Sequence, residues 1–441
     1  MKKHTRPAFA GRGINFLTRE QMEKIHSATL QLMQETGIVV QHKGALELLE
    51  KAGCRVVKKH VYFTPSIVEW AIKTAPSRIL LYDRDGNFAM DCSGRNTYYG
   101  VGSAEPRIID PYTGEQRLCN EEDNKNCVKV ADAMPYIDYM MSLCQVYDHP
   151  KTSYEHEYAA MIRYSSKPQV VITNDLESTK NVVEMAAVAR GGIDKLQQKP
   201  LFILYCEPTS PMVCTRESID KVMYMAEMNL PVLYAPIPMN GATGPITMAG
   251  SIVQANAECL AGLVIAQLTN PGCPFLFGAI ITNMDLKSLQ PTYASPETQI
   301  ESLALSEIGR DLYKLPTWGT AGCTSSKMAD DLMESIEPYD LSQTVFTPEM
   351  VMLLEEEAER QGKEAKVHIK LDTGMSRIGF QVTSENVDLC AKIAGLPLLY
   401  AEGIFSHFAT ADETDLTKTK KQAEKIILLH CMSCCCTCGL F

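Results

Sequence analysis

The chain lacks the features that mark several large classes of protein. Its 441 residues contain no uninterrupted apolar run of about 18 residues, the length that a membrane-spanning helix requires. The N-terminal segment MKKHTRPAFAGRGINF is basic but has no apolar core of the kind found in secretory signals. A net charge of −11 argues against a surface for nucleic acid or anionic membranes. These absences predict a cytoplasmic enzyme with no nucleic-acid or membrane partner.

Paired cysteines are absent from most of the chain. Eleven of the 16 cysteines are scattered over residues 1–430 without a Cys-x-x-Cys pair, a pattern typical of reduced and buried thiols. The other five lie in the final segment, CMSCCCTCGLF. That segment lacks the paired spacing and the intervening loop of a zinc site. We therefore predict no metal site and interpret residues 431–441 as a cysteine-rich tail of non-native appearance.

Helix start signals stand out in the N-terminal region. Thr18 and Gln21 have the spacing of a capping box, and residues 19–36 follow with helical periodicity. Thr64-Pro65 predicts a second helix, with proline at its first position. Between about residues 78 and 118 the pattern becomes short and strand-like around turn-rich segments such as DPYTG.

From about residue 136, apolar strand-like segments alternate with helical patterns. This alternation predicts parallel βαβ units, and several of the strands are apolar on both faces, as a covered parallel sheet requires. No GxGxxG motif follows the first strand, which weakens a dinucleotide-binding sheet. We predict an α/β fold of the (β/α)8 TIM-barrel type, with an open doubly wound sheet as the alternative. The six strands are YIDYMMSLCQVY, PQVVIT, PLFILYC, PVLYAPI, CPFLFGAII and PTWGTAGC.

Several separate motifs occur in an order that resembles one known family. The longest is PMNGATGPITMAGSIVQANAECLAGLVIAQLTNPGCPFLFG, residues 238–278. The others are YYGVGSAEPRIIDPYTGEQR, EPTSPM, SPE and GTAGCTSSK. Over about residues 5–331 the chain resembles the trimethylamine methyltransferase family, the corrinoid-dependent MttB superfamily. The resemblance implies a (β/α)8 barrel that moves a methyl group from a small methylated amine to the cobalt of a partner corrinoid protein. It implies no tightly bound cofactor, and a homo-oligomer is possible.

The resemblance also bears on the substrate. The family contains pyrrolysine members that use trimethylamine, and a larger group without pyrrolysine. Some members of that larger group demethylate quaternary amines such as glycine betaine. All 441 residues here are standard amino acids, so the non-pyrrolysine type and a quaternary amine are the prediction.

Such a reaction needs no protein nucleophile, because a quaternary ammonium is an activated methyl donor. The site must hold a bulky cation and aim one methyl group, which aromatic rings support by about 0.5–2 kcal/mol each and carboxylates by their charge. In a barrel these groups are expected at the C-terminal ends of the strands. A strand tyrosine is more often a core or interface residue than a substrate contact, and a histidine before proline is more often a turn residue than an acid or base. The candidates are Glu207, Tyr205, Tyr234, Phe277, Asn240 and His149 near strand ends, with Tyr98 and Tyr99 reaching over the mouth of the barrel.

The stretch KVHIKLDTGMSRIGF, residues 366–380, differs in character from what precedes it. With AEGIFSHFATADETD (residues 401–415), it resembles alanine racemase over about residues 336–425. That family is a (β/α)8 barrel with pyridoxal phosphate bound as a Schiff base, and the matching positions are Lys370, Arg377 and His407. The family's VKANAYGHG-like motif, which supplies the cofactor lysine, is absent here. We therefore expect neither pyridoxal phosphate nor racemase activity, and interpret these three residues as relics.

Two incomplete resemblances suggest a composite chain. We predict an MttB-like barrel, incomplete at its C-terminus, over residues 1–333, a racemase-like fragment of two βα units over 334–430, and the tail from 431. Six strands and two strands make eight, so a hybrid closed barrel is one alternative. Another alternative is an inactive chimera of two gene fragments.

Overall fold

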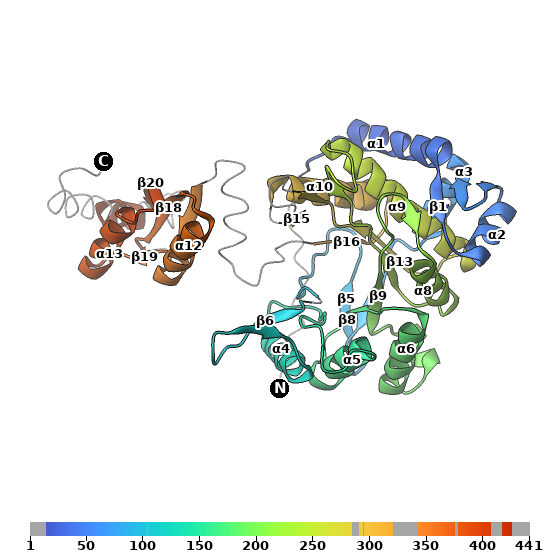
Figure 1. Ribbon diagram of the computed structural model, residues 1–441, viewed down its shortest axis with the longest axis horizontal. Coiled ribbons are helices and arrows are strands. Elements are labelled where there is room, and N and C mark those ends of the chain that lie inside the picture. The colour runs from blue at the N-terminus through green and yellow to red at the C-terminus, as the bar shows by residue number, and fades with distance from the viewer. Residues whose placement is uncertain are drawn as a thin grey trace. The chain divides into compact units, whose positions relative to one another are not determined.

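The computed structural model describes residues 15–103, 105–284, 291–293, 295–320, 342–374, 378–406 and 417–425. The chain divides into two compact units (Figure 1). Unit 1 comprises Met1–Pro291 and Pro296–Gly322, and unit 2 comprises Thr292–Ser295 and Cys323–Phe441. Their hydrophobic cores share no residue.

Unit 1 begins with three helices and a small sheet. The predicted capping box is present, because the Thr18 side chain accepts from the Gln21 backbone and the Gln21 side chain accepts in return. Pro65 begins the second predicted helix. The elements are α1 (Arg19–Gln31), η1 (Leu32–Thr36), β1 (Ile38–Val40), α2 (Lys43–Lys51), β2 (Arg55–Val57), β3 (His60–Tyr62) and α3 (Pro65–Thr74), with β10 (Val213–Cys214) completing the sheet in the order β10-β1-β3-β2.

Two hairpins and a helix follow. The first hairpin closes one end of the five-stranded sheet at the centre of unit 1. The Tyr82 N–H donates to the Pro200 carbonyl and the Arg84 N–H to that of Ser166, so this hairpin meets the chain just before two central strands begin. The elements are β4 (Leu80–Tyr82), β5 (Phe88–Asp91), β6 (Arg107–Ile109), β7 (Gln116–Leu118) and α4 (Glu121–Ala133).

The centre of unit 1 is a five-stranded parallel sheet in the order β16-β13-β11-β9-β8. Every strand pairs with the next one along the chain, and Met140 extends the series through a parallel bridge to Gln169. This order never reverses, which contradicts the doubly wound alternative. All six predicted strand positions therefore belong to one singly wound α/β sheet of the barrel type. The strands are β8 (Gln169–Ile172), β9 (Phe202–Cys206), β11 (Val232–Tyr234), β13 (Phe275–Ala279) and β16 (Thr317–Gly319).

The sheet is strongly curved. Tyr205 on β9 and Trp318 on β16 are three strand positions apart, which is about 14 Å in a flat sheet. Their ring centroids lie only 5.6 Å apart. Side chains that point to the concave face therefore converge, as they do inside a barrel.

Helices cover the convex face of the sheet (Figure 1). Alternate strand residues divide between two clusters: Leu204 packs with the helices, whereas Ile203 and Tyr205 pack in the concave interior. The remaining elements of unit 1 are α5 (Ser153–Tyr164), α6 (Leu176–Arg190), α7 (Ile193–Gln198), α8 (Arg216–Glu227), β12 (Met239–Asn240), α9 (Met248–Thr269), β14 (Thr282–Met284), α10 (Pro296–Glu307) and η2 (Ile308–Tyr313), and β15 (Pro291–Thr292) pairs with β14.

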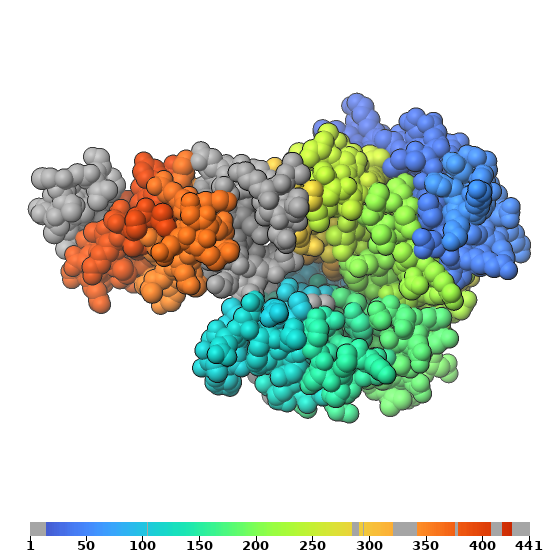
Figure 2. All heavy atoms as spheres, viewed as in Figure 1, coloured from blue at the N-terminus to red at the C-terminus, as the bar shows by residue number. Residues whose placement is uncertain are grey.

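The helix α9 is long and apolar enough to span a membrane, which the search for uninterrupted apolar runs did not anticipate. However, 78% of the most apolar 18-residue window of this helix is buried inside the protein. α1, α2 and α3 pack on it, and Figure 2 shows the blue N-terminal residues directly against the yellow-green ones. α9 is therefore the central core helix of unit 1.

Unit 2 has its own parallel sheet, in which β18 pairs with β17, β19 and β20. The predicted strands around residues 366–374 and 398–409 are present as β18 and β20, and β17 is an additional strand. Among the described residues, the strands of unit 2 form a sheet of their own, and the hybrid closed barrel stays a prediction. The elements are β17 (Ser342–Val345), α12 (Pro348–Gln361), β18 (Ala365–Asp372), β19 (Phe380–Gln381), α13 (Ser384–Ala394) and β20 (Leu399–Ser406), and residues 417–425 are helical.

Candidate functional site

Two predicted site residues lie together where β9 ends. Tyr205 points to the concave face and is 6% exposed, and Glu207 follows the last strand residue and is exposed. The Tyr205 hydroxyl donates to Glu207 Oε2 at 3.0 Å. The strand end thus holds a carboxylate in place at the carboxyl edge of the sheet while leaving it open to solvent.

Aromatic side chains from two other elements lie near this pair. Trp318 meets Tyr205 edge to face. Tyr154 lies in the first turn of α5, and burial raises the pKa of its hydroxyl, followed by the nearby carboxylates of Glu157 and Glu207. The four groups Tyr154, Tyr205, Glu207 and Trp318, here called the aromatic–acid cluster, combine π faces with one exposed negative charge.

A small pocket lies beside this cluster. Its lining includes Ser103, Ser142, Tyr154 and Glu157. Glu157 is buried and accepts hydrogen bonds from the Ser153 hydroxyl at 2.9 Å and the Val146 N–H at 3.2 Å. Burial raises the pKa of Glu157 despite these donors.

A second polar group lies where the chain leaves β11 and β13. The predicted residue Asn240 is buried, and its amide donates to Asn283 Oδ1 and to Glu301 Oε1, each at 2.8 Å. Burial raises the pKa of Glu301 to about 7. Among the described residues, four buried oxygens here have no hydrogen-bond partner: Asn240 Oδ1, Thr282 Oγ1, Glu297 Oε2 and Glu301 Oε2. Such atoms favour a bound polar ligand or water.

Tyr234 and Phe277 do not join either group. Both are fully buried and belong to the cluster between the sheet and the helices, so the structure contradicts their prediction as substrate contacts. The Tyr234 ring lies against Gly262 of α9, and the Phe277 ring packs edge to face on Tyr313. The physical reason is strand alternation, since neighbouring residues of a strand point to opposite faces of the sheet. Tyr234 and Phe277 each lie next to a residue that faces the concave side, so their own side chains face the helices.

Tyr98 and Tyr99 lie at the opposite edge of the sheet from the one predicted. The Tyr98 hydroxyl accepts from the Asp91 N–H, and Tyr99 exchanges hydrogen bonds with Asp138, just before the first strand position. These contacts place both tyrosines at the amino edge, and the Tyr99 ring is 54% exposed there. The prediction that they reach over the mouth is therefore wrong.

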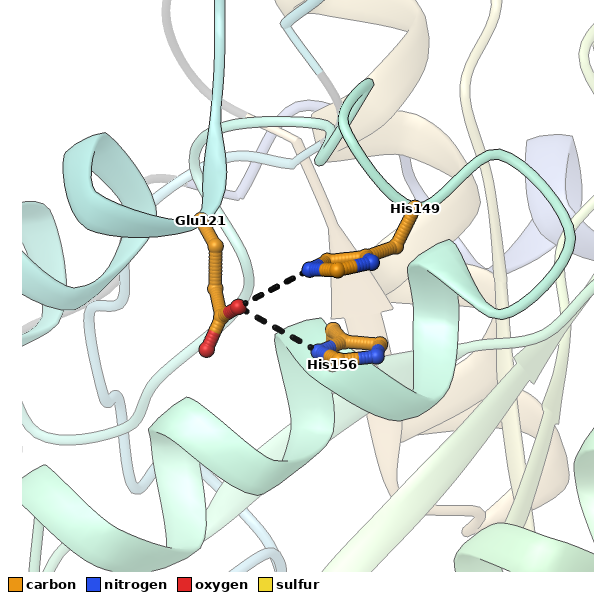
Figure 3. Close-up of side chains that lie close together, drawn as sticks. All are labelled: Glu121, His149 and His156. Atoms are coloured by element: carbon orange, nitrogen blue, oxygen red, sulfur yellow. Dashed lines mark hydrogen bonds and ion pairs between the residues drawn. The ribbon is translucent and has the colours of Figure 1, made fainter.

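His149 lies in a different cluster, shown in Figure 3. Its Nε2 lies 3.1 Å from Glu121 Oε2, and His156 Nδ1 lies 3.5 Å from the same oxygen. The two imidazole rings stack with centroids 3.8 Å apart and planes within 9°. The Lys125 ammonium lies 3.1 Å from Glu121 Oε1 and is the main reason why the pKa of Glu121 lies below its ordinary value.

Of the three racemase-like positions, the structure describes only Lys370. It is buried in β18, where its ammonium donates to the Leu371 carbonyl at 2.9 Å and lies 5.2 Å from the Phe405 ring. Arg377 and His407 lie outside the described residues.

Sequence reasoning missed Trp318, Tyr154 and Glu301, which complete these groups. Trp318 follows the rule that strand ends carry function, and it could have been found by applying that rule to the sixth strand. Tyr154 and Glu301 lie in helices whose facing side only the packing reveals.

A singly wound parallel sheet with aromatic and acidic side chains at its carboxyl edge is the architecture of an α/β-barrel enzyme. Residues 4–337 match the model of the family described as trimethylamine methyltransferase (MTTB), and the chain belongs to this family. Residues 319–430 match a second model, the N-terminal domain of alanine racemase. Both predicted resemblances are confirmed, and the two matches overlap over residues 319–337.

Individual proteins are similar to parts of the chain. The chain is 32% identical over 323 residues to trimethylamine methyltransferase MttB of Desulfitobacterium hafniense (strain DSM 10664 / DCB-2), covering 73% of this chain and 65% of that protein. It is 29% identical over 318 residues to glycine betaine methyltransferase of Desulfitobacterium hafniense (strain Y51), covering 72% and 66%. The chain thus spans just under two thirds of these relatives. A solved alanine racemase of Clostridium difficile 630 is 31% identical over 30% of this chain and 33% of its own, with a TM-score of 0.23.

Proposed function

We propose that unit 1 is a corrinoid-dependent methyltransferase that takes a methyl group from a quaternary amine, such as a betaine. The observation that carries the proposal is the aromatic–acid cluster at the carboxyl edge of a sheet that belongs to the methyltransferase family. The relatives named for trimethylamine and glycine betaine support a methylated amine as the substrate class. The standard residues throughout the chain support a quaternary amine.

The cluster suits a quaternary ammonium for two reasons. Its methyl groups carry diffuse positive charge and cannot donate strong hydrogen bonds, so ring faces and a nearby carboxylate are the matching partners. Tyr205 positions the Glu207 carboxylate through the 3.0 Å hydrogen bond, which limits its rotation before substrate arrives.

Glu301 and Asn240 suit the other end of a betaine. A substrate carboxylate requires hydrogen-bond donors, and a protonated Glu301, with its pKa of about 7, supplies one at neutral or lower pH. Asn240 holds the opposite oxygen of Glu301, which leaves Oε2 to bear the proton. Of the unpartnered oxygens of this group, only those that carry a proton, the Thr282 hydroxyl and a protonated Glu301 Oε2, can donate to a substrate carboxylate.

The transfer itself is a displacement that conserves atoms and charge. The methyl acceptor is reduced cobalt in a corrinoid carried by a partner protein. Its electron pair forms the new bond to carbon, and the carbon–nitrogen bond breaks with its pair remaining on nitrogen. The products are a tertiary amine and a methylated corrinoid. The residues of this chain bind and orient the donor, and none acts as a nucleophile.

A direct assay tests this proposal. The purified chain is mixed with reduced cobalamin as acceptor and with glycine betaine, proline betaine or trimethylamine in parallel. Methylation of cobalt is followed by its visible absorption. We expect turnover with at least one betaine and slower turnover with trimethylamine, which carries no permanent charge. Preference for trimethylamine would contradict the substrate assignment.

Variants connect the activity to the cluster. Glu207→Gln removes the negative charge, and we expect kcat/KM to fall about tenfold or more, the equivalent of about 1.4 kcal/mol. Tyr205→Phe frees the carboxylate and should lower kcat/KM less. Tyr112→Phe is the matched control, because Tyr112 is 95% exposed on the β6–β7 turn. An equal effect of all three changes would sink the assignment.

One observation favours the alternative of an inactive chimera. The methyltransferase match ends at residue 337, and the chain spans only 65% of a relative's length. A chain that folds well but transfers no methyl group to cobalamin from any of these donors would support that alternative. For unit 2 we propose no racemase activity, and a Schiff-base absorption band after addition of pyridoxal phosphate would overturn this.

A further inference from the structure

We infer that Glu121, His149 and His156 form a binding site for a divalent transition-metal ion, with Zn²⁺ as the best fit. The three side chains come from separate elements of unit 1: Glu121 begins α4, His149 lies in the turn before α5, and His156 lies in α5 (Figure 3). They lie outside the aromatic–acid cluster, so this inference does not rest on the proposed methyltransferase activity.

The spacing of the three donor atoms matches a metal coordination shell. Zn²⁺ binds imidazole nitrogen and carboxylate oxygen at about 2.0–2.2 Å, so neighbouring ligand atoms of a tetrahedral site lie about 3.3–3.6 Å apart. Glu121 Oε2 lies 3.1 Å from His149 Nε2 and 3.5 Å from His156 Nδ1. All three donor atoms lie within 4.8 Å of one another. Because the two imidazole planes are within 9° of parallel, one ring must rotate about its Cβ–Cγ bond before both nitrogen lone pairs point at the same ion. That rotation gives the ion three protein ligands.

Hydrogen bonding alone does not account for this convergence. His149 Nε2 lies within hydrogen-bonding distance of Glu121 Oε2, whereas His156 Nδ1 approaches the same oxygen at 3.5 Å, beyond the usual N–H···O length of about 2.7–3.2 Å. A metal ion gives the carboxylate oxygen and both ring nitrogens one common partner.

The surroundings support a monodentate carboxylate ligand. Lys125 engages Glu121 Oε1 at 3.1 Å, so Oε2 is the oxygen left for an ion. The Asp148 carboxylate accepts from the Glu121 N–H at 3.1 Å, which anchors the ligand's backbone to the turn that carries His149. Two imidazoles and one carboxylate are a donor set that first-row transition metals favour, and a fourth position stays open to water.

Bound at this place, the ion would link α4 to α5 and to the turn between the first strand position and α5. Those segments carry Tyr154, Glu157 and the small pocket. The inferred role is therefore to hold the N-terminal turn of α5 in position. Metal binding should raise the melting temperature of unit 1, because the ion binds the folded chain and no preformed site exists in the unfolded one.

The test uses the full-length chain stripped of metal with a chelator. Because residues 431–441 contain five cysteines, accessible thiols are first alkylated under native conditions. Zn²⁺ is then titrated in competition with a chromophoric chelator. We expect one ion per chain with micromolar affinity or tighter. Glu121→Gln, His149→Gln and His156→Gln should each weaken binding at least about 100-fold. His60→Gln is the control, because His60 lies in β3 and stacks on Tyr62.

A spectrum of the wild-type chain provides a readout that needs no variant. Co²⁺ in place of Zn²⁺ should show the intense visible bands of a low-coordinate site without a thiolate-to-cobalt charge-transfer band. Binding that disappears on alkylation, a thiolate charge-transfer band, or equal affinity in all three ligand variants would overturn the site. The melting temperature of each metal-free variant is compared with that of the wild type, so that loss of binding is not confused with loss of folding.

Discussion

Two glutamates at the carboxyl edge of the main sheet have opposite environments. Glu207 is exposed to solvent and receives a hydrogen bond from the Tyr205 hydroxyl. Glu301 is fully buried, and desolvation outweighs the hydrogen bond from Asn240, so its pKa rises to about 7. One glutamate is therefore open to solvent, whereas the other is held in a desolvated site.

The buried carboxyl of Glu301 should make stability depend on pH. Its pKa is about 7 in the folded chain against 4.5 ordinarily, so the folded state binds the proton more tightly. That contribution is fully present below pH 4.5 and is lost as pH rises through 7. Relative to Glu301→Gln, which cannot ionise, the wild type should lose up to about 3 kcal/mol between pH 4.5 and pH 8. Urea unfolding of both proteins at several pH values measures this difference.

The control for that experiment is Leu204→Ala, because Leu204 is fully buried and carries no ionisable group. Its difference in stability from the wild type should stay nearly constant over the same pH range. If the difference in unfolding free energy between the wild type and Glu301→Gln did not change with pH, Glu301 would be ionised in the folded protein. The donor role proposed for it would then be lost.

At the scale of elements, the contact between α9 and β11 determines how closely the central helix approaches the sheet. A Cβ atom at Gly262 would lie 2.2 Å from the nearest ring carbon of Tyr234, well inside contact distance. Gly262 is therefore required by packing rather than by backbone conformation. The same contact explains why Tyr234 serves as a core residue, since its ring fills the space that the glycine leaves.

Gly262→Ala tests this contact. In an exposed helix, Gly→Ala stabilises by about 0.5–1 kcal/mol, whereas here overpacking should destabilise by about 1–3 kcal/mol. In a Tyr234→Ala background the same change should be neutral or stabilising, because the clashing ring is gone. Chemical unfolding of the four proteins in this cycle gives the coupling energy. Additive effects would contradict direct contact between the two residues.

At the scale of the whole molecule, each unit has its own buried hydrophobic residues among the described part of the chain, and the two units match two different families. Unit 1 packs its helices on one sheet, while unit 2 packs α12 and α13 with β18 and its neighbours. In unit 2, Tyr400 and Phe405 on β20 are 53% and 40% exposed, so part of its sheet lacks the cover that parallel strands ordinarily have. We therefore propose that the units unfold separately and that unit 2 is the less stable.

Calorimetry with one core variant in each unit examines this. Val367→Ala in β18 should lower only the first of two transitions, by several degrees, and Leu204→Ala in β9 should lower only the second. Both side chains are fully buried, which makes them a matched pair. A single transition that moves with either substitution would show that the two units fold as one body.

Much of the main sheet followed from the sequence. Five of the six predicted strands formed, and the first is present only as isolated bridges such as that at Met140. The five were predictable because buried parallel strands are continuous apolar segments that turn residues interrupt. Tyr205 and Glu207 were predictable because a polar residue after such a segment lies at the edge of the sheet. The face of a strand residue was not, because strands that are apolar on both sides conceal their alternation, and for that reason Tyr234 and Phe277 were assigned to the wrong side.

The sequence by itself determined family, strand order and the carboxyl-edge pair, since motifs and apolar periodicity are local properties of the chain. Only the tertiary structure decided which distant side chains meet. Curvature of the sheet brought Trp318 to Tyr205, and helix packing buried Glu301 beside Asn240. Glu121, His149 and His156 are separated by 27 and 6 intervening residues, with no recognisable metal spacing, and they converge because α4 and α5 pack side by side. Local pattern specifies the elements, whereas contacts between elements specify the sites.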